Sequence, residues 1–430
     1  MTLFLEVALA LLFGLLFTRV TNIFKLPDVT AYLIAGVLVG PYCLGRLGIE
    51  GLGFTTHETV EQLSFISDLA LGFIAFAIGS EFRMSSLKKT GKQAFVIGIL
   101  QALITTAVVD VALLLVHLAV GSKLSVAAAI TLGSIAAATA PAATLMVVRQ
   151  YKAKGKVTDI LLPVVALDDA VGLAVFAVSF GIAKALAGGT LDLVSIVVNP
   201  LLEIVCSLAL GALLGCVLTA LERLYHSNRN RIALIVGFVI ATVGLSMLKI
   251  KIDSATVGFS SLLVCMMLGT VFCNICPLSE DLMNRADKWT SPLMALFFVI
   301  SGAELELSVF SSLTIVGIGL AYILSRSAGK YIGAYISCRL VKAEPEVTKY
   351  LGLTLLPQAG VALGMCVTAG ELEGDGSLIK NVILFGVLIY ELIGPLLTKI
   401  ALTKSGDISE KSPELKNRRR AKLAELNADK

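Results

Sequence analysis

Charged side chains are scarce in this chain of 430 residues: Asp, Glu, Lys and Arg make up 15%, whereas hydrophobic residues make up 57%. A water-soluble protein usually carries about 25% charged residues, and a soluble chain of this length would divide into about two or three domains. The mean hydropathy is +0.89. This composition argues against a water-soluble protein and indicates a chain that is embedded in a membrane.

Patterns that bind metals or form disulfides are also lacking. The eight cysteines lie mostly in apolar stretches, where cysteine behaves as a small hydrophobic residue. Cys273 and Cys276 are the exception, but no second pair or nearby histidine completes a zinc site. The three histidines, His57, His117 and His226, have no spacing suited to a metal. We therefore expect no cofactor, and we expect that the protein is not an enzyme.

The chain has instead a series of apolar stretches of about 17 to 30 residues, each long enough to span a hydrocarbon core roughly 30 Å thick. We identify thirteen such segments, at residues 3–20, 29–47, 60–79, 94–120, 124–148, 160–184, 193–221, 232–248, 255–274, 289–303, 309–338, 349–369 and 378–402. No basic leader precedes the first segment, so we expect it to remain as a helix. The sequence predicts an all-α polytopic membrane protein with about 13 transmembrane helices.

The distribution of basic residues predicts the orientation of these helices, because short cytoplasmic loops are enriched in Lys and Arg. With the N-terminus outside and the C-terminus inside, 27 of the 35 Lys and Arg residues fall on the cytoplasmic side. They include those of a short basic tail at residues 404–430. We therefore expect a multi-pass protein of the cell inner (plasma) membrane with this orientation.

Two similar stretches indicate an internal repeat. Gly79-Ser80-Glu81 ends the third segment, and Gly302-Ala303-Glu304 ends the tenth, 223 residues and seven crossings later. Because seven is odd, the two copies would face opposite ways, as in secondary transporters built from inverted repeats. We expect inverted six-helix repeats at about residues 1–185 and 231–403, joined by a linker helix at about residues 192–222.

Two segments contain breaks that a plain spanning helix would not have. The residues at the breaks are Thr139, Ala140 and Pro141 in the fifth segment and Pro357, Gln358 and Gly360 in the twelfth. Proline lacks a backbone donor and disrupts the preceding turn, and broken helices in matching halves of a transporter mark its binding site. Simple proline kinks are the alternative. The matched positions favour two discontinuous helices around a site at the bilayer midplane.

Asp168 and Asp169 stand side by side in the sixth segment, where a carboxylate costs at least about 2.5 kcal/mol. Neighbours lie about 100° apart around a helix, so one can pair while the other faces an ion. The candidate partner is Lys330 in segment eleven, for which a fixed counter-ion role is the alternative to a titrating one. Arg326, one turn away, is expected to be structural. Glu391 follows Asp168 by 223 residues, and we expect it to satisfy a broken-helix end or Arg326.

Six stretches carry a resemblance to a known family, at residues 26–27, 35–41, 76–82, 167–173, 329–330 and 358–360. Together they resemble the monovalent cation:proton antiporter superfamily, in particular the bacterial sodium/proton exchangers of its second branch. The resemblance covers nearly the whole membrane region. It implies a dimer in which each copy has a static interface domain and a mobile core domain with crossed broken helices.

The resemblance also implies roles for individual residues. Asp168 would pair with Lys330, Asp169 would bind the cation and the proton, and Thr139 would add oxygens beside Asp169. Many relatives carry Asp or Ser where Ala140 stands, so the choice among Na⁺, K⁺ and Li⁺ stays open. The charged tail has no Gly-rich unit for a nucleotide, unlike the ligand-gated potassium-efflux relatives.

These features predict a secondary transporter that exchanges a monovalent cation for protons through an Asp-Asp site. Na⁺ is the first candidate, with K⁺ or Li⁺ as alternatives. A carboxylate away from water is readily neutralised by a proton, so a proton and a cation would compete for Asp169. Opening of the Asp168–Lys330 pair would release a second proton and make exchange electrogenic. The partners would be these ions, the bilayer and a second copy in a homodimer, with no nucleic acid.

Two other functions also use membrane aspartates or a related fold. An intramembrane aspartyl protease needs carboxylates that converge from two helices and share a proton, whereas Asp168 and Asp169 are neighbours on one helix. A sodium-coupled organic solute symporter of related fold would need a larger substrate cavity. The sequence therefore argues against the protease and leaves the symporter as the alternative.

Overall fold

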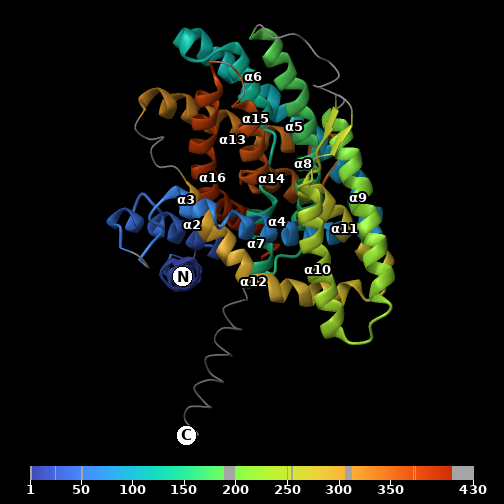
Figure 1. The fold of residues 1–430 in the computed structure, drawn as a ribbon. Helices are drawn as coiled ribbons and strands as arrows, with labels where there is room; N and C mark the ends of the chain where they lie inside the picture. The colour runs from blue at the N-terminus through green and yellow to red at the C-terminus, as the bar shows by residue number, and fades with distance from the viewer. Residues whose placement is uncertain are drawn as a thin grey trace.

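The computed structural model describes residues 2–24, 26–49, 52–187, 199–248, 250–252, 255–305, 312–370, 372 and 374–408. The first half of the chain contains α1 (Thr2–Ile23), α2 (Asp28–Val39), η1 (Leu44–Leu47), α3 (His57–Glu61), α4 (Ser64–Gly79), η2 (Ser80–Phe82), α5 (Met84–Val120), η3 (Gly121–Lys123), α6 (Val126–Ile135), α7 (Pro141–Tyr151) and α8 (Lys156–Leu186). The second half contains α9 (Asn199–Glu222), α10 (Asn228–Ser246), β1 (Ile250–Ile252), β2 (Ala255–Val257), α11 (Ser261–Ile275), α12 (Ser279–Glu304), α13 (Leu313–Leu340), α14 (Pro345–Thr354), α15 (Gly360–Ala369) and α16 (Gly376–Lys404). Helices α9 and α10 lie along one edge next to α11, whereas α13 and α16 lie together elsewhere (Figure 1).

Each of the thirteen predicted segments contains at least one helix. Within the part of the chain that the structure describes, eight helical spans are long and apolar enough to cross a membrane, among them α1, α5, α8 and α16. The predicted fold class, a helical membrane protein with many apolar helices, is therefore confirmed. The number of crossings stays a prediction.

The ninth segment differs from its prediction at its start. Residues Ala255–Val257 form β2, which pairs antiparallel with β1 so that Ile250 is opposite Val257. β-Branched residues are frequent in this stretch and favour an extended backbone. Helix α11 begins only at Ser261, where the Ser260 side chain caps the helix by accepting from the Leu263 N–H. The fold is thus helical with one short hairpin among the described residues.

Glycines bring α2 against α12 and α4 against α11. Gly36 and Gly302 permit the first crossing, because a Cβ on either would collide with a backbone carbonyl of the other helix. Gly79 and Gly269 permit the second crossing in the same way. Small residues allow such close approach between membrane helices. Each crossing joins a helix of one predicted repeat to a helix of the other, and the inverted repeat itself stays a prediction.

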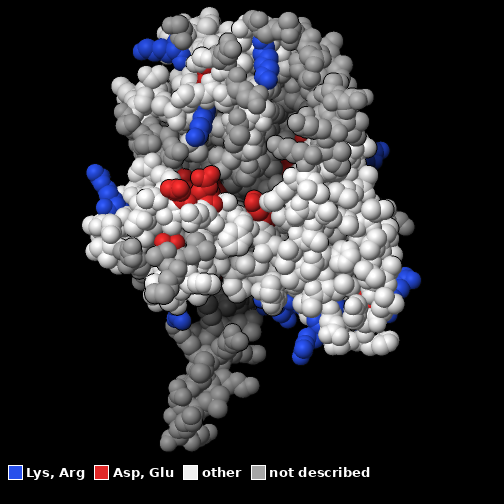
Figure 2. All heavy atoms as spheres, in the orientation of Figure 1, with Lys and Arg blue, Asp and Glu red and all other residues white. Residues whose placement is uncertain are grey.

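Apolar residues form both the interior and much of the surface. One buried cluster joins parts of α2, α4, α7, α8, α11 and α12, and another joins parts of α6, α8, α13, α15 and α16. Large apolar side chains are exposed on the outer helices, including Phe4, Leu118 and Leu213. The face drawn in Figure 2 carries few charges over most of its described area. The exposed apolar side chains on the outer helices suit contact with lipid.

The helix that carries both aspartates is fixed at its start by Asp407, which follows the end of α16. Asp407 Oδ2 accepts from the Thr158 N–H at 2.7 Å and from the Thr158 hydroxyl at 2.8 Å, which satisfies a free donor in the first turn of α8.

The predicted linker corresponds to α9, with residues 192–198 outside the described residues. Residues 409–430 of the predicted basic tail lie outside them as well.

Candidate functional site

The fifth and twelfth segments are each two helices separated by a non-helical stretch, as the sequence predicts. Residues 136–140 separate α6 from α7, and residues 355–359 separate α14 from α15. Pro141 takes the first position of α7, where a helix needs no N–H donor. The two breaks lie side by side, because the Ala140 N–H donates to the Pro357 carbonyl at 2.8 Å. Together they hold the ends of four short helices at one place.

Arg326 of α13 satisfies the carbonyl groups that these breaks leave open. Its guanidinium donates to the Ala136 carbonyl at 3.0 Å, to the Ala138 carbonyl at 2.6 Å and to the Leu356 carbonyl at 2.7 Å. The side chain is fully buried and its guanidinium lies 4.4 Å from the centre of the Tyr390 ring. A cation at helix C-terminal ends also complements their negative partial charge. This geometry gives Arg326 a structural part in joining both breaks.

Gln358 and Tyr322 add a second connection between the breaks. The Gln358 amide donates to the Ile135 carbonyl at 3.1 Å, and its oxygen accepts from the Tyr322 hydroxyl at 3.2 Å. Both side chains are fully buried. Gln358 therefore holds the second break against the C-terminal end of α6.

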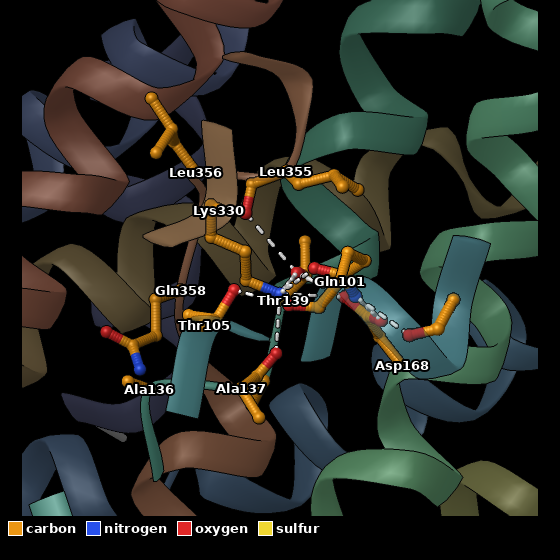
Figure 3. Close-up of polar contacts among 12 residues, drawn as sticks. Gln101, Thr105, Ala136, Ala137, Thr139, Asp168, Lys330, Leu355, Leu356 and Gln358 are labelled. Atoms are coloured by element: carbon orange, nitrogen blue, oxygen red, sulfur yellow. Dashed lines mark hydrogen bonds and ion pairs between the residues drawn. The ribbon is translucent and has the colours of Figure 1, made fainter. Parts of the chain in front are cut away.

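Lys330 and Asp168 meet between α13 and α8 (Figure 3). The Lys330 Nζ lies 3.0 Å from Asp168 Oδ2, and neither side chain is exposed. The ammonium also donates to the Ala137 carbonyl at 2.5 Å and to the Thr139 hydroxyl at 2.8 Å. A buried ion pair persists only when further hydrogen bonds satisfy its remaining groups, and the first break supplies them here.

Thr139 makes hydrogen bonds with the ion pair, and its predicted place beside Asp169 stays a prediction. Its hydroxyl donates to Asp168 Oδ2 at 2.6 Å and accepts from Lys330, whereas the expectation was oxygens beside Asp169. A hydroxyl both donates and accepts, so it can satisfy the carboxylate and the ammonium together. Thr139 therefore belongs to the ion pair.

Gln101 completes the surroundings of the pair, and the sequence reasoning missed it. Its amide nitrogen donates to Asp168 Oδ1, and its amide oxygen accepts from Lys330 Nζ at 3.1 Å (Figure 3). The side chain is fully buried on α5. Its position follows from a close approach of α5 to α13, because a Cβ on Gly333 would lie 2.9 Å from the Gln101 carbonyl oxygen. A polar amide within the apolar segment 94–120 was the available signal.

Asp169 lies in a small cavity of its own. The cavity has a volume of about 30 Å³ and is lined among others by Ala140, Pro141 and Gly360. Asp169 is 5% exposed, and its Oδ1 has no hydrogen-bond partner among the described residues. Pro141 and Gly360 begin α7 and α15, whose N-terminal ends carry positive partial charge that favours a carboxylate. The space is enough for about one water molecule or one small ion.

Two larger cavities lie near this site, and they relate to it differently. The first is lined by Lys184 and Glu203 among others, has a volume of about 710 Å³ and is called the Lys184 cavity. It shares Leu71, Leu262, Gly360 and Val361 with the lining of the Asp169 cavity. The second, the Arg149 cavity, is lined by Arg149 and Asp287 among others and has a volume of about 480 Å³. It shares no described lining residue with the Asp169 cavity. Asp169 is thus adjacent to the Lys184 cavity and separated from the Arg149 cavity.

Glu391 is buried in α16, but the structure does not join it to Arg326. Within the described residues, the hydrogen bonds of Arg326 go to backbone carbonyls and no ion pair links it to Glu391. The guanidinium instead binds the carbonyls of the breaks, and the other expected role of Glu391, at a broken-helix end, stays a prediction. No three His, Cys, Asp or Glu side chains gather as a metal site in the described part of the chain.

The fold and this site define a class of protein: a membrane transporter with two interrupted helices that meet at buried carboxylates. Residues 7–404 match the family described as "Sodium/hydrogen exchanger, transmembrane". The chain therefore belongs to the sodium/hydrogen exchanger family, a family of membrane cation/proton antiporters rather than enzymes.

Individual relatives agree with this family. The chain is 24% identical over 404 residues to the K⁺/H⁺ antiporter subunit KhtU of Bacillus subtilis, with 92% of each chain covered. It is 24% identical over 366 residues to the Na⁺/H⁺ antiporter NhaS4 of Synechocystis, covering 80% of this chain and 83% of the relative. Its fold is similar to that of the sodium proton antiporter MjNhaP1 from Methanocaldococcus jannaschii, with a TM-score of 0.75 at 18% identity over 94% of this chain and 96% of the other.

Proposed function

We propose that the protein exchanges a monovalent cation, with Na⁺ as the first candidate, for protons at Asp169. The observation that carries this proposal is the Asp169 carboxylate, which is buried and has an oxygen without a hydrogen-bond partner among the described residues. It lies where the two interrupted helices meet. A carboxylate without a fixed partner can be neutralised in turn by a proton or by a cation.

Competition for this carboxylate is the proposed coupling. A charged group inside a membrane protein is costly, so the site can change sides only when Asp169 carries a proton or a cation. The carboxylate then moves a cation in one direction and a proton in the other. Each ion gradient drives the other through a single group.

The Asp168–Lys330 pair is the proposed source of electrogenic exchange. A cation bound at Asp169 would stand near the Lys330 ammonium, and a nearby like charge disfavours the charged form of a lysine. If Lys330 gives up its proton when the cation binds, one cation exchanges for two protons and one net charge crosses. Gln101 and Thr139 hold Asp168 toward Lys330 during this step.

The cation must be small, because the Asp169 cavity measures about 30 Å³. Sites for organic molecules usually measure about 300 to 1,000 Å³. This volume suits an ion, but the adjacent Lys184 cavity, about 710 Å³, is large enough for an organic solute, so the family match is what favours an ion over the solute of a sodium-coupled symporter. The names of the relatives include both a K⁺/H⁺ and a Na⁺/H⁺ antiporter, so K⁺ and Li⁺ belong in every test.

We also propose that the Arg149 cavity faces the cytoplasm and the Lys184 cavity faces the outside. Arg149, Lys152 and Lys154 line the first cavity, and cytoplasmic loops are rich in such residues. This orientation puts the N-terminus outside and the C-terminus inside, in the plasma membrane. A homodimer is proposed on the family resemblance.

The test uses purified protein in liposomes that contain a pH-sensitive dye, with Na⁺, K⁺ or Li⁺ added outside. Asp169→Asn should abolish cation-dependent proton movement, because an amide cannot exchange a proton for a cation. Glu346→Gln is the matched control, since Glu346 is an exposed carboxylate in the first turn of α14. Full exchange in Asp169→Asn, or no exchange with any of the three cations in the unchanged protein, would overturn the proposal.

A further inference from the structure

The last turn of α7 is bound to two other helices, α2 and α12. Arg149 forms an ion pair with Asp287 of α12. The Gln150 side-chain oxygen accepts from the Asp28 N–H of α2 at 2.9 Å. The Tyr151 hydroxyl lies 3.5 Å from the carbonyl oxygen of Leu26, just before α2. Three consecutive residues thus connect one end of α7 to α2 and α12.

The Gln150 contact is built into the start of α2. Pro27 occupies the N-cap position and makes no capping hydrogen bond through its side chain. The first N–H groups of a helix have no partner inside that helix, so each needs an acceptor from elsewhere. Gln150 supplies one from a different helix. The contact is therefore a cap that depends on α7 staying in place.

The Arg149–Asp287 pair is suited to opening and closing. Its side chains are 30% and 34% exposed, and ion pairs in contact with solvent contribute little to overall stability. Such a pair is nevertheless strong enough to shift an equilibrium between two arrangements by a few-fold. It can therefore bias the equilibrium between two conformations without locking the protein in one.

The helices on the two sides of these contacts have different relations to Asp169. Helix α7 begins at Pro141, in the wall of the Asp169 cavity. Helices α2 and α12 are held to each other at the glycine crossing of Gly36 and Gly302. The contacts thus join α7, which borders the Asp169 cavity, to the packed pair of α2 and α12. Arg149 and Asp287 both line the Arg149 cavity, which is separated from Asp169.

We infer that Arg149, Gln150 and Tyr151, with Asp287 and the start of α2, form a clasp that closes Asp169 off from the Arg149 cavity. Release of this clasp is the step that exposes Asp169 on that side. The inference rests on the proposed exchange, because only a site that changes sides needs such a release. The clasp residues position the helix and do not touch the transported ion.

The test measures access to the Asp169 cavity and requires no transport. Ala142 lines that cavity and is 7% exposed, so Ala142→Cys reports on it. Sealed membrane vesicles of each orientation are treated with a membrane-impermeant thiol reagent, and modification at residue 142 is quantified by mass spectrometry of the peptide that contains it. The native cysteines can remain, because each peptide is read separately.

Weakening the clasp should raise labelling from the Arg149 side and lower it from the Lys184 side. We expect about a two- to fivefold change for Asp287→Asn and for Gln150→Leu, as for the loss of one exposed polar contact. The exchanged pair, Arg149→Asp with Asp287→Arg, should return labelling toward that of the unchanged clasp. The matched control is Arg285→Gln, which breaks the Arg285–Asp281 pair within α12 and leaves α7 untouched.

Unchanged labelling from the Arg149 side in both Asp287→Asn and Gln150→Leu would overturn the clasp. So would an equal change in Arg285→Gln. If the unchanged protein exchanges cations for protons while labelling does not respond, the clasp is wrong and the proposed function stands. If labelling responds but no cation moves protons, the clasp stands and the proposed function fails.

Discussion

The buried ion pair yields a prediction in which two substitutions have opposite pH dependence. Lys330→Gln leaves Asp168 fully buried, with Gln101 and Thr139 as its remaining donors. Asp168→Asn leaves the Lys330 ammonium fully buried, with the Ala137 carbonyl among its remaining acceptors. Removal of one partner from a buried pair costs about 3–5 kcal/mol, because the other charge is left uncompensated. Each variant can avoid part of this cost by neutralising the charge that is left.

The sign of the pH dependence follows from which group is left. In Lys330→Gln, the folded protein holds a proton on Asp168 that the unfolded chain releases, so the free energy of unfolding falls as pH rises. In Asp168→Asn, folded Lys330 gives up a proton that the unfolded chain keeps, so this free energy rises with pH. Three pH units correspond to about 4 kcal/mol, which is comparable to the whole cost.

The assay is thermal unfolding of purified protein in detergent at pH 5 and pH 8. A loss of about 3–5 kcal/mol should lower the melting midpoint by roughly 6–10 °C, if a large chain loses about 2 °C per kcal/mol. We expect this loss for Lys330→Gln mainly at pH 8 and for Asp168→Asn mainly at pH 5. The double variant should be more stable than the worse single variant at either pH, because no buried charge remains. Equal losses at both pH values, or no recovery in the double variant, would refute this reasoning.

Three further substitutions test contacts of the ion pair, of the breaks and of the α2–α12 crossing. Gln101→Leu should reduce the rate of cation-dependent proton exchange and lower the melting midpoint by several degrees, because a hydrogen bond to a charged group contributes about 1.5–3 kcal/mol. Gln93 lies on the same helix as Gln101 and donates to the Val341 carbonyl at the end of α13, so Gln93→Leu should leave exchange unchanged in the dye assay. Arg326→Lys should lower the free energy of unfolding by about 2–4 kcal/mol, because one ammonium cannot reproduce the planar guanidinium contacts to Ala136, Ala138 and Leu356. A melting midpoint within a degree of the original would contradict this prediction. Gly302→Ala should impair folding, measured as the yield of monodisperse protein, because its Cβ would collide with the Leu33 carbonyl, whereas Gly317→Ala meets no atom within 4 Å and should have normal yield.

Some parts of the site could be predicted from residues close together in the chain. Asp168 and Asp169 could be predicted as site residues, because two carboxylates in one apolar segment cost too much free energy to be there without a function. The breaks at Pro141 and Pro357 follow from the missing proline N–H. In contrast, Gln101 has no local signal beyond one amide in an apolar segment, and it joins the site only because α5 packs closely against α13.

The sequence by itself determined the class of architecture: apolar segments of spanning length, two interruptions and a carboxylate pair. These are local properties, set by the cost of placing polar groups in lipid. Only the tertiary structure decided that Thr139 bonds to the ion pair, that Arg326 binds the carbonyls of the breaks, and that the Asp169 cavity shares lining residues with the Lys184 cavity. Each of these depends on a distance between segments that are remote in the chain. The packing of the helices sets that distance, and no local sequence pattern predicts it.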